Sequence, residues 1–187
     1  MRYIIVVFIA LCISCFSFGQ MNVTEPDKSP LDMSYSPQGF PIIKFQNKQA
    51  DAKPNARLVY SRPQVKSRII FGEEVKYNEV WRLGANESTE IDFYKNAVIG
   101  GRKIGKGRYT MYCIPEENRW TFIINKDTDS WGGFSYSESM DVLRTTVPVI
   151  KNETPVEYLT MYFDNANNLV VMWADVKVNL PIQFVAK

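Results

Sequence analysis

The sequence predicts an all-β protein, an antiparallel β-sandwich or jelly roll with an extended N-terminal arm. Three observations predict it. From residue 56 onward the chain is a series of runs of about five to eight residues, rich in β-branched and aromatic side chains. These runs are bounded by Gly, Pro, Asn or Asp, which are residues typical of turns. No long stretch shows a helical period, so the layers of the domain must be sheets.

The expected strands follow one another closely along the domain. In several of them apolar and polar residues alternate, as Ile91 and Phe93 do with Glu90 and Asp92, so one face is expected to be buried. Residues 115–118 and 164–168 are expected to be hairpin turns, and only residues 137–143 suit a turn or two of helix. The strands are expected at 56–61, 88–95, 107–115, 119–125, 142–150, 157–163, 168–174 and 176–182.

Residues 1–19 have the pattern of a secretory signal peptide. Arg2 precedes an apolar run that is too short for a comfortable membrane span, and the small residues Ser17 and Gly19 mark a cleavage site. We therefore expect a periplasmic or secreted protein that begins at Gln20 and has no transmembrane segment after cleavage.

Attachment of a lipid to Cys12 or Cys15 is the alternative. Leu11 is bulky for the position before a lipid-bearing Cys12, and Cys12 is a poor residue three places before Cys15, so ordinary cleavage is favoured. Cleavage leaves Cys113 as the single cysteine, and its apolar surroundings in the sequence predict a buried, unreactive thiol. Mass spectrometry of the mature N-terminus tests this prediction: a diacylated Cys12 or Cys15 would show an outer-membrane lipoprotein instead.

Residues 20–55 form the expected arm, and residues 56–187 form the expected domain. Within the arm, residues 39–45 are apolar enough for a strand or for a stretch that docks on the domain, and Leu31, Met33 and Tyr35 occupy alternate positions. The arm is interrupted by five prolines, Pro26, Pro30, Pro37, Pro41 and Pro54.

Composition excludes several classes of function. The chain contains no histidine, which removes serine and cysteine triads and metal sites built on imidazole. The formal net charge is only +2, and no basic tract alternates with aromatic residues, so no nucleic acid partner is expected. We expect no metal and no cofactor, and the oligomeric state stays open.

The stretch "VWRLGANEST" (80–89) is the best candidate for a site. Val80 and Trp81 can anchor the loop in the core, Gly84 and Asn86 suit turn conformations, and Arg82, Asn86 and Glu87 are then displayed on a fixed backbone. A guanidinium, an amide and a carboxylate beside an aromatic ring suit a sugar, a carboxylate or a phosphate. The simpler alternative is that Arg82 pairs with Glu87 and that nothing binds.

The stretch "NKDTDSWGGFSYSE" (125–138) resembles a calcium loop in its spacing. Asp127, Asp129, Gly132 and Glu138 take the first, third, sixth and twelfth positions, but Trp131 stands at the fifth, where an oxygen ligand is required. We therefore expect the spacing to be coincidental, with a polar loop whose Trp131 packs on the sheet. A second alternative is that Trp131, Phe134 and Tyr136 stack on a sugar ring.

The stretch "GGRKIGKGRY" (100–109) places four basic residues among glycines. Its lysines are not followed by Ser or Thr, and a strand rather than a helix is expected next, so it is not a phosphate-binding loop. A basic hairpin turn is expected.

Taken together, the ordered motifs resemble the bacterial domain-of-unknown-function family 2911. The resemblance rests on "YSRP" (60–63), "RIIFG" (68–72), "VWRLGANEST", "GGRKIGKGRYTMYCIP" (100–115), "WTFIINKDTDSWG" (120–132) and "DVLR" (141–144). It covers about residues 56–182 and implies an exported bacterial protein with no established reaction. The family signature centres on Trp81 and Arg82 and on the Gly-Ala-Asn-Glu run Gly84, Ala85, Asn86 and Glu87, and its Ser-Arg-Pro arginine corresponds to Arg62.

These observations favour a binding domain that holds a small polar or anionic ligand, such as a saccharide or a cell-envelope fragment. The expected ligand-binding residues are Arg62, Trp81, Arg82, Asn86 and Glu87. Whether the protein is an enzyme stays open. A hydrolase or lyase would use Glu87 as general acid or base, with Arg62 or Arg82 stabilising an anion. A purely structural envelope protein is the third alternative.

Overall fold

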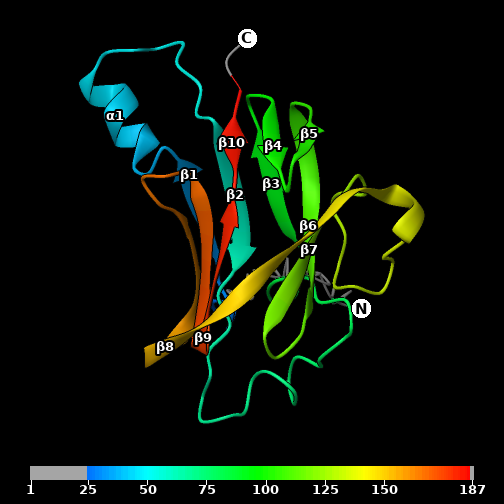
Figure 1. Cartoon of the computed structure of the whole chain (residues 1–187). Coiled ribbons are helices and arrows are strands. Elements are labelled where there is room, and N and C mark those ends of the chain that lie inside the picture. Colours follow the sequence, from blue (N-terminus) through cyan, green and yellow to red (C-terminus); the bar gives the residue numbers. More distant parts are fainter. Residues whose placement is uncertain (1–24, 186–187) are drawn as a thin grey trace, which may run out of the picture.

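The computed structural model describes residues 25–185 of the chain (Figure 1). The expected signal peptide, with Cys12 and Cys15, lies outside the described residues. No helix in the described part is long and apolar enough to span a membrane. Cys113 is buried, which raises the pKa of its thiol.

The fold is all-β and antiparallel, as predicted. One seven-stranded sheet has the order β1-β2-β3-β6-β7-β8-β9, and a three-stranded sheet has the order β10-β4-β5. The strands of the large sheet are β1 (Leu31–Ser36), β2 (Ala56–Ser61), β3 (Thr89–Phe93), β6 (Gly107–Pro115), β7 (Arg119–Asn125), β8 (Asp141–Phe163) and β9 (Asn168–Pro181). The small sheet contains β4 (Ala97–Ile99), β5 (Arg102–Ile104) and β10 (Gln183–Phe184).

The large sheet curls back on itself because β8 changes partners along its length. Its first part pairs with β7, and its last part, Thr160 to Phe163, pairs with the start of β9 across register shifts. The residues after β2 then join the far part of β8, since Val65 donates a backbone hydrogen bond to Glu157 (2.9 Å) and Leu159 donates one to Pro63 (3.0 Å). The two strands expected at 142–150 and 157–163 are thus one bent strand, and so are those expected at 168–174 and 176–182.

The inside of the curl is filled by aromatic residues. Trp81 stacks on Trp173 at 5.9 Å between ring centroids and meets Trp120 edge to face at 5.7 Å. Phe71, from the long loop between β2 and β3, lies 5.0 Å from Trp120. Such pairs stabilise a core beyond the apolar area that they bury. The small sheet covers one end of the curl and contributes Ala97, Ile99 and Ile104 to the core.

The arm forms two elements before the domain. β1 pairs with β2 from Leu31↔Ser61 to Ser36↔Ala56, with Ser34 and Ser36 on its buried face, while Leu31 and Met33 are exposed. The expectation of a strand or docked stretch at 39–45 was wrong, because Phe40–Gln46 form helix α1, which buries none of its residues. The helix begins where Gly39 adopts a left-handed conformation and a proline occupies the first turn.

Two shorter predictions have mixed outcomes. Residues 138–140 form a single 3-10 turn, Glu138–Met140, within the short helix expected at 137–143. The basic segment 100–109 does turn at Gly100 and Gly101, both of positive φ, but its two arms are β4 and β5 of a second sheet that the sequence did not predict.

Candidate functional site

The Gly-Ala-Asn-Glu turn docks on the end of β2 through Ser61. The Ser61 hydroxyl donates to the Ala85 carbonyl and accepts from the Ala85 amide, both at 2.6 Å. A Cβ on Gly84 would lie 2.6 Å from the Ser61 Oγ. Gly84 is therefore required by a close approach, and the expectation that it serves a turn conformation was wrong. The left-handed residues of the loop are Leu83 (φ 56°) and Asn86 (φ 60°).

Trp81 belongs to the core and anchors the loop. Its backbone forms two hydrogen bonds with Cys113 of β6, at 2.7 and 2.8 Å, and its side chain is only 7% exposed. The indole N–H donates to the Gly84 carbonyl at 3.1 Å. The ring therefore faces the other core tryptophans and supports the turn from below, so the structure does not bring it to a surface where a ligand could stack.

Arg62 joins the arm to β8. Its guanidinium donates to the Leu159 carbonyl (3.2 Å), to the Thr160 hydroxyl (3.0 Å) and to the Asp32 carboxylate (3.1 Å). It also lies 5.7 Å from the centre of the Tyr158 ring, within the range of a cation–π contact. All three hydrogen bonds hold β1, β2 and β8 together, and none reaches the Gly-Ala-Asn-Glu turn.

Arg82 is half-buried and makes no ion pair among the described residues. Its Nε is buried without a hydrogen-bond partner, and burial lowers the pKa of the guanidinium. The pairing of Arg82 with Glu87, which was the simpler alternative to a binding site, is not formed. Arg82 also lines neither of the hollows described below.

A second loop, residues 127–133, packs against the Asn86–Ser88 backbone. The Ser88 amide donates to the Ser130 carbonyl (3.0 Å), and the Gly132 amide donates to the Asn86 carbonyl (2.9 Å). The buried Ser88 hydroxyl donates to the Gly132 carbonyl at 2.6 Å. Glu87 and Trp131 are therefore directly opposite each other on two bridged strands of backbone. The sequence offered no signal that these two loops meet.

Two adjoining hollows lie along this junction, and together we call them the Glu87–Trp131 groove. One has a volume of about 340 Å³ and the other about 280 Å³, and both are lined by Leu31 of the arm and by Glu87. Trp131 lines the first and is 60% exposed, so the expectation that it packs on the sheet was wrong. The remaining lining residues are Asp27, Ser29, Pro30, Val59, Asn86, Ser88, Glu90, Asp129 and Ser130.

The groove is acidic. Its charged lining residues are Asp27, Glu87, Glu90 and Asp129, and no Lys or Arg lines it. Arg108, beside the groove, pairs with Asp129 and lies 3.5 Å from the Glu90 carboxylate, so the Asp129 hydrogen bond and the Glu90 charge raise the pKa of the guanidinium. Glu87 is exposed and makes no ion pair within residues 25–185.

The calcium-like spacing does not gather its carboxylates. Asp129 pairs with Arg108, while Glu138 pairs with Arg144 at 3.3 Å. No group of three or more Asp, Glu, Cys or His side chains that could hold a metal occurs in the described part of the chain.

A larger hollow lies elsewhere, between the β4–β5 turn, β8 and the β9–β10 segment. Its volume is about 880 Å³, and no charged residue lines it. Asn179, whose Oδ1 is buried without a partner, is among its lining residues. It contains none of the expected ligand-binding residues, so the Glu87–Trp131 groove remains the candidate site.

Comparisons with known proteins add the family and nothing on its chemistry. Residues 44–182 match a family model with the description "Protein of unknown function (DUF2911)". No curated protein and no solved structure matches the chain.

Proposed function

Because the chain belongs to the DUF2911 family, which is described only as being of unknown function, we propose a function from the geometry of its groove. The protein is an exported binding domain that holds a saccharide, uncharged or carrying an amine, in the Glu87–Trp131 groove. Export rests on the signal-peptide pattern of residues 1–19.

The single observation that carries the proposal is the position of Trp131. Its ring is 60% exposed, but its backbone is held between Ser130 and Gly132, both hydrogen-bonded to the signature turn. An exposed tryptophan on fixed backbone leaves a large apolar surface in water, which folding alone does not favour. A saccharide ring can cover that surface while its hydroxyls bond to Glu87 and Asn86, the carboxylate and the amide that line the same hollow.

Charge decides which saccharides fit. Four carboxylates and no cation line the groove, so an anionic ligand meets like charge. Arg108 pairs with both Glu90 and Asp129 and offsets one of their two negative charges, whereas Glu87 makes no ion pair in the described part of the chain and can accept from hydroxyl or ammonium groups. The proposal therefore keeps the polar ligand expected from the sequence and drops the anionic one.

The hydrolase or lyase alternative has less support from this geometry. It required Arg62 or Arg82 to stabilise an anion beside Glu87. Arg62 is committed to Asp32, Thr160 and the Leu159 carbonyl, and Arg82 lines neither hollow. Binding needs neither arginine and is therefore favoured.

Fluorescence quenching tests the proposal, because Trp131 is the single exposed tryptophan. The other three are 1–7% exposed, so acrylamide quenches Trp131 selectively. We expect glucose and glucosamine to protect Trp131 from acrylamide. Glucuronate, which has the same ring with a carboxylate, should bind at least about tenfold more weakly, a difference of about 1.4 kcal/mol. Glu87→Gln should reduce the difference in binding affinity between glucosamine and glucuronate.

Two exposed aromatic residues provide a matched pair of variants. The measurement is the rise in melting temperature that a saccharide causes. Trp131→Ala should abolish the stabilisation, whereas Phe134→Ala should retain it, because Phe134 is 89% exposed and lines neither hollow. If no saccharide protects Trp131 and none stabilises the parent protein, the binding proposal is wrong and a structural role takes its place.

A further inference from the structure

One end of the molecule concentrates the positive charge. Residues 40–54 and 94–107 contain seven of the 22 Lys and Arg and only Asp51 of the 20 Asp and Glu, so the remaining chain holds 15 cationic and 19 anionic side chains. None of the seven makes an ion pair within the described residues. They are Lys44, Lys48, Lys53, Lys95, Arg102, Lys103 and Lys106. We call the surface made by these two segments the basic end.

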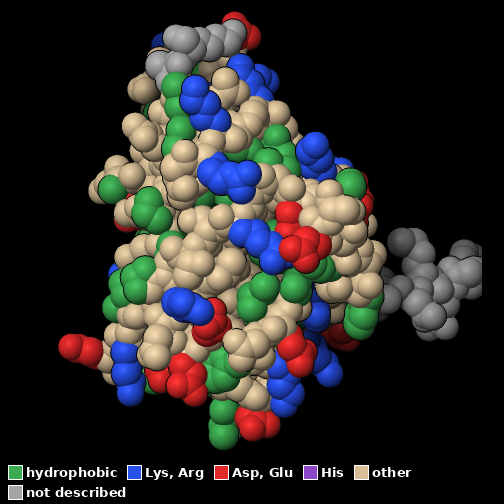
Figure 2. Space-filling model, turned by 45° about the vertical axis from the view of Figure 1, so that its right-hand side comes forward, with side chains coloured by type: hydrophobic (Ala, Val, Ile, Leu, Met, Phe, Trp, Pro, Cys, Tyr) green, Lys and Arg blue, Asp and Glu red, His purple; other side chains and the backbone are tan. Residues whose placement is uncertain are grey.

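Hydrogen bonds show that the two segments are contiguous. The Lys95 amide of the second segment donates to the Asn55 carbonyl at 3.3 Å, directly after the first segment, and the Tyr94 amide donates to the same carbonyl at 2.9 Å. Figure 1 shows α1, β4 and β5 at the same end of the molecule. In Figure 2, Lys and Arg side chains occur over the whole visible face, whereas Asp and Glu lie mostly in its lower part, so the upper part is predominantly basic.

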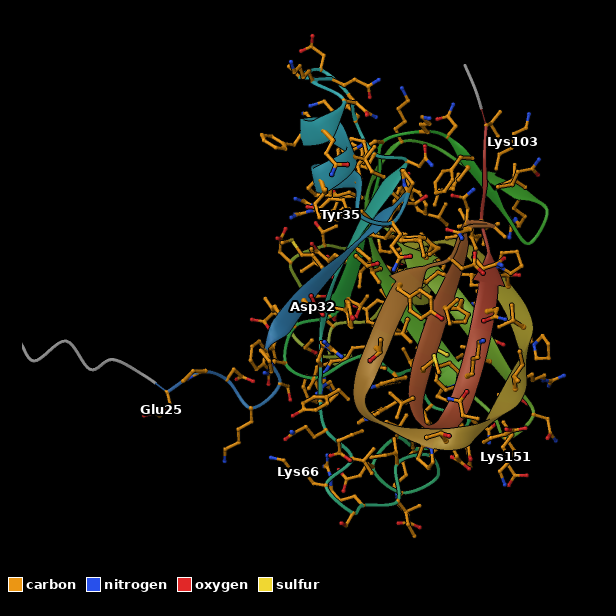
Figure 3. All side chains as sticks on the ribbon, turned by 90° about the vertical axis from the view of Figure 1, so that its left-hand side faces the viewer. Glu25, Asp32, Tyr35, Lys66, Lys103 and Lys151 are labelled. Atoms are coloured by element: carbon orange, nitrogen blue, oxygen red, sulfur yellow. The ribbon has the colours of Figure 1, made fainter. Side chains whose placement is uncertain are left out.

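The basic end also exposes apolar side chains. In α1, Phe45 is 83% exposed and Ile42 is 63% exposed, and the helix buries no residue against the sheet. Figure 3 shows α1 projecting from the strands above Tyr35, at the same end as Lys103 and opposite to Lys66 and Lys151. Leaving two large apolar side chains in water beside Lys44 and Lys48 is unfavourable unless another surface covers them.

We infer that the basic end docks on an anionic lipid surface, with Phe45 and Ile42 entering the interface between headgroups and acyl chains. The combination of features selects this occupant. Cations clustered around exposed apolar side chains on a short helix match a membrane interface, where anionic headgroups attract the lysines and the apolar groups leave water. An anionic polysaccharide would use the charges but leave Phe45 and Ile42 uncovered.

Docking in this way leaves the candidate groove free. None of the seven cations lines the Glu87–Trp131 groove, so a bound membrane need not occlude it. The inference does not depend on the saccharide proposal, and it gives the protein a location as well as a ligand.

Vesicle flotation tests the inference. The purified protein should float with vesicles of phosphatidylcholine and phosphatidylglycerol, but not with pure phosphatidylcholine, and added salt should weaken the binding. Each cation near an anionic surface contributes a factor of about five, so Arg102→Glu, Lys103→Glu and Lys106→Glu together should lower affinity at least about 100-fold. Lys48→Glu with Lys53→Glu, both outside strands and helices, should weaken binding without touching the hairpin.

Matched variants separate the basic end from the rest of the surface. Lys66→Glu with Lys151→Glu reverses two exposed lysines at the opposite end and should leave vesicle binding within about twofold. Phe45→Ser should weaken binding about tenfold, whereas Phe134→Ser, which alters an equally exposed ring elsewhere, should not. The parent and the variants have the same N-terminus, which mass spectrometry checks, so the N-terminal segment contributes equally to vesicle binding in each of them.

Four outcomes would overturn the inference. The first is no binding to anionic vesicles, and the second is an equal loss from reversals at both ends. The third is a concentration-dependent dimer that Phe45→Ser abolishes while vesicles bind nothing, since that result would make a second copy of the chain the occupant. The fourth is retention on an anionic polysaccharide without vesicle binding, because that result would make the polysaccharide, and not a membrane, the occupant of the basic end.

Discussion

Replacing Trp81 by alanine is expected to lower the free energy of unfolding by about 3 to 5 kcal/mol. The side chain is 7% exposed and lies against Trp120, Trp173 and Phe71, so its removal leaves a cavity in the centre of the curl. It also removes the indole donor to the Gly84 carbonyl. Urea denaturation followed by far-ultraviolet circular dichroism measures the change, because that signal does not depend on tryptophan fluorescence.

The matched control is Trp131→Ala, which removes the same side chain from an exposed position. Its cost should stay within about 0.5 kcal/mol, as is usual for surface substitutions. The tryptophan of the signature stretch and the tryptophan of the loop that packs against it would then separate into a core residue and a surface residue. A Trp81→Ala variant that unfolds within about 1 kcal/mol of the parent would contradict the core assignment.

Replacing Gly84 by alanine should destabilise the protein by about 1 to 3 kcal/mol, the usual range for inserting a methyl group into a packed site. The added Cβ would lie 2.6 Å from the Ser61 Oγ, and that oxygen is held by two hydrogen bonds to Ala85. Neither side can move without breaking the contact that joins the Ser-Arg-Pro and Gly-Ala-Asn-Glu motifs. Thermal and urea unfolding would show the loss.

A double-mutant cycle with Ser61→Ala identifies the contact. Removing the hydroxyl makes room for the new methyl group, so the double variant should cost at least about 1 kcal/mol less than the sum of the two single variants. Gly105→Ala is the glycine control, since its added Cβ would meet no atom closer than 3.9 Å and its φ is not left-handed. Strict additivity would show that Gly84 is required for another reason.

Much of the fold could be predicted from the sequence because its signals are local. Alternating residues such as Ile91 and Phe93 indicate a half-buried strand within a few positions, and Pro and Asn residues indicate the turns between strands. The family could likewise be identified from ordered motifs, and residues 44–182 match it. Local signals failed for α1, where an apolar stretch that suited a strand forms a helix that buries none of its residues.

The site could be predicted only in part. Asn86 and Glu87 do line a groove, but Trp81 belongs to the core, and Arg62 holds the arm to β8. Ser61, which positions the turn, and Trp131, which faces Glu87, gave no sign in the sequence that they belong to this region. A spacing pattern shows which residues share a loop but not which face of that loop meets the core.

By itself, the sequence determined the antiparallel β class, the approximate positions of most strands of the large sheet and the signature that identifies the family. Only the tertiary structure decided that residues 127–133 lie on the Gly-Ala-Asn-Glu turn and that α1 and the β4–β5 hairpin share one basic end. It also decided that Arg62 donates to Asp32 while the Arg82 Nε is buried without a partner. The physical reason is that strand propensity acts within a few residues. The partners of a loop depend on how β8 bends and how far the sheet curls, and those depend on contacts between residues far apart in the chain.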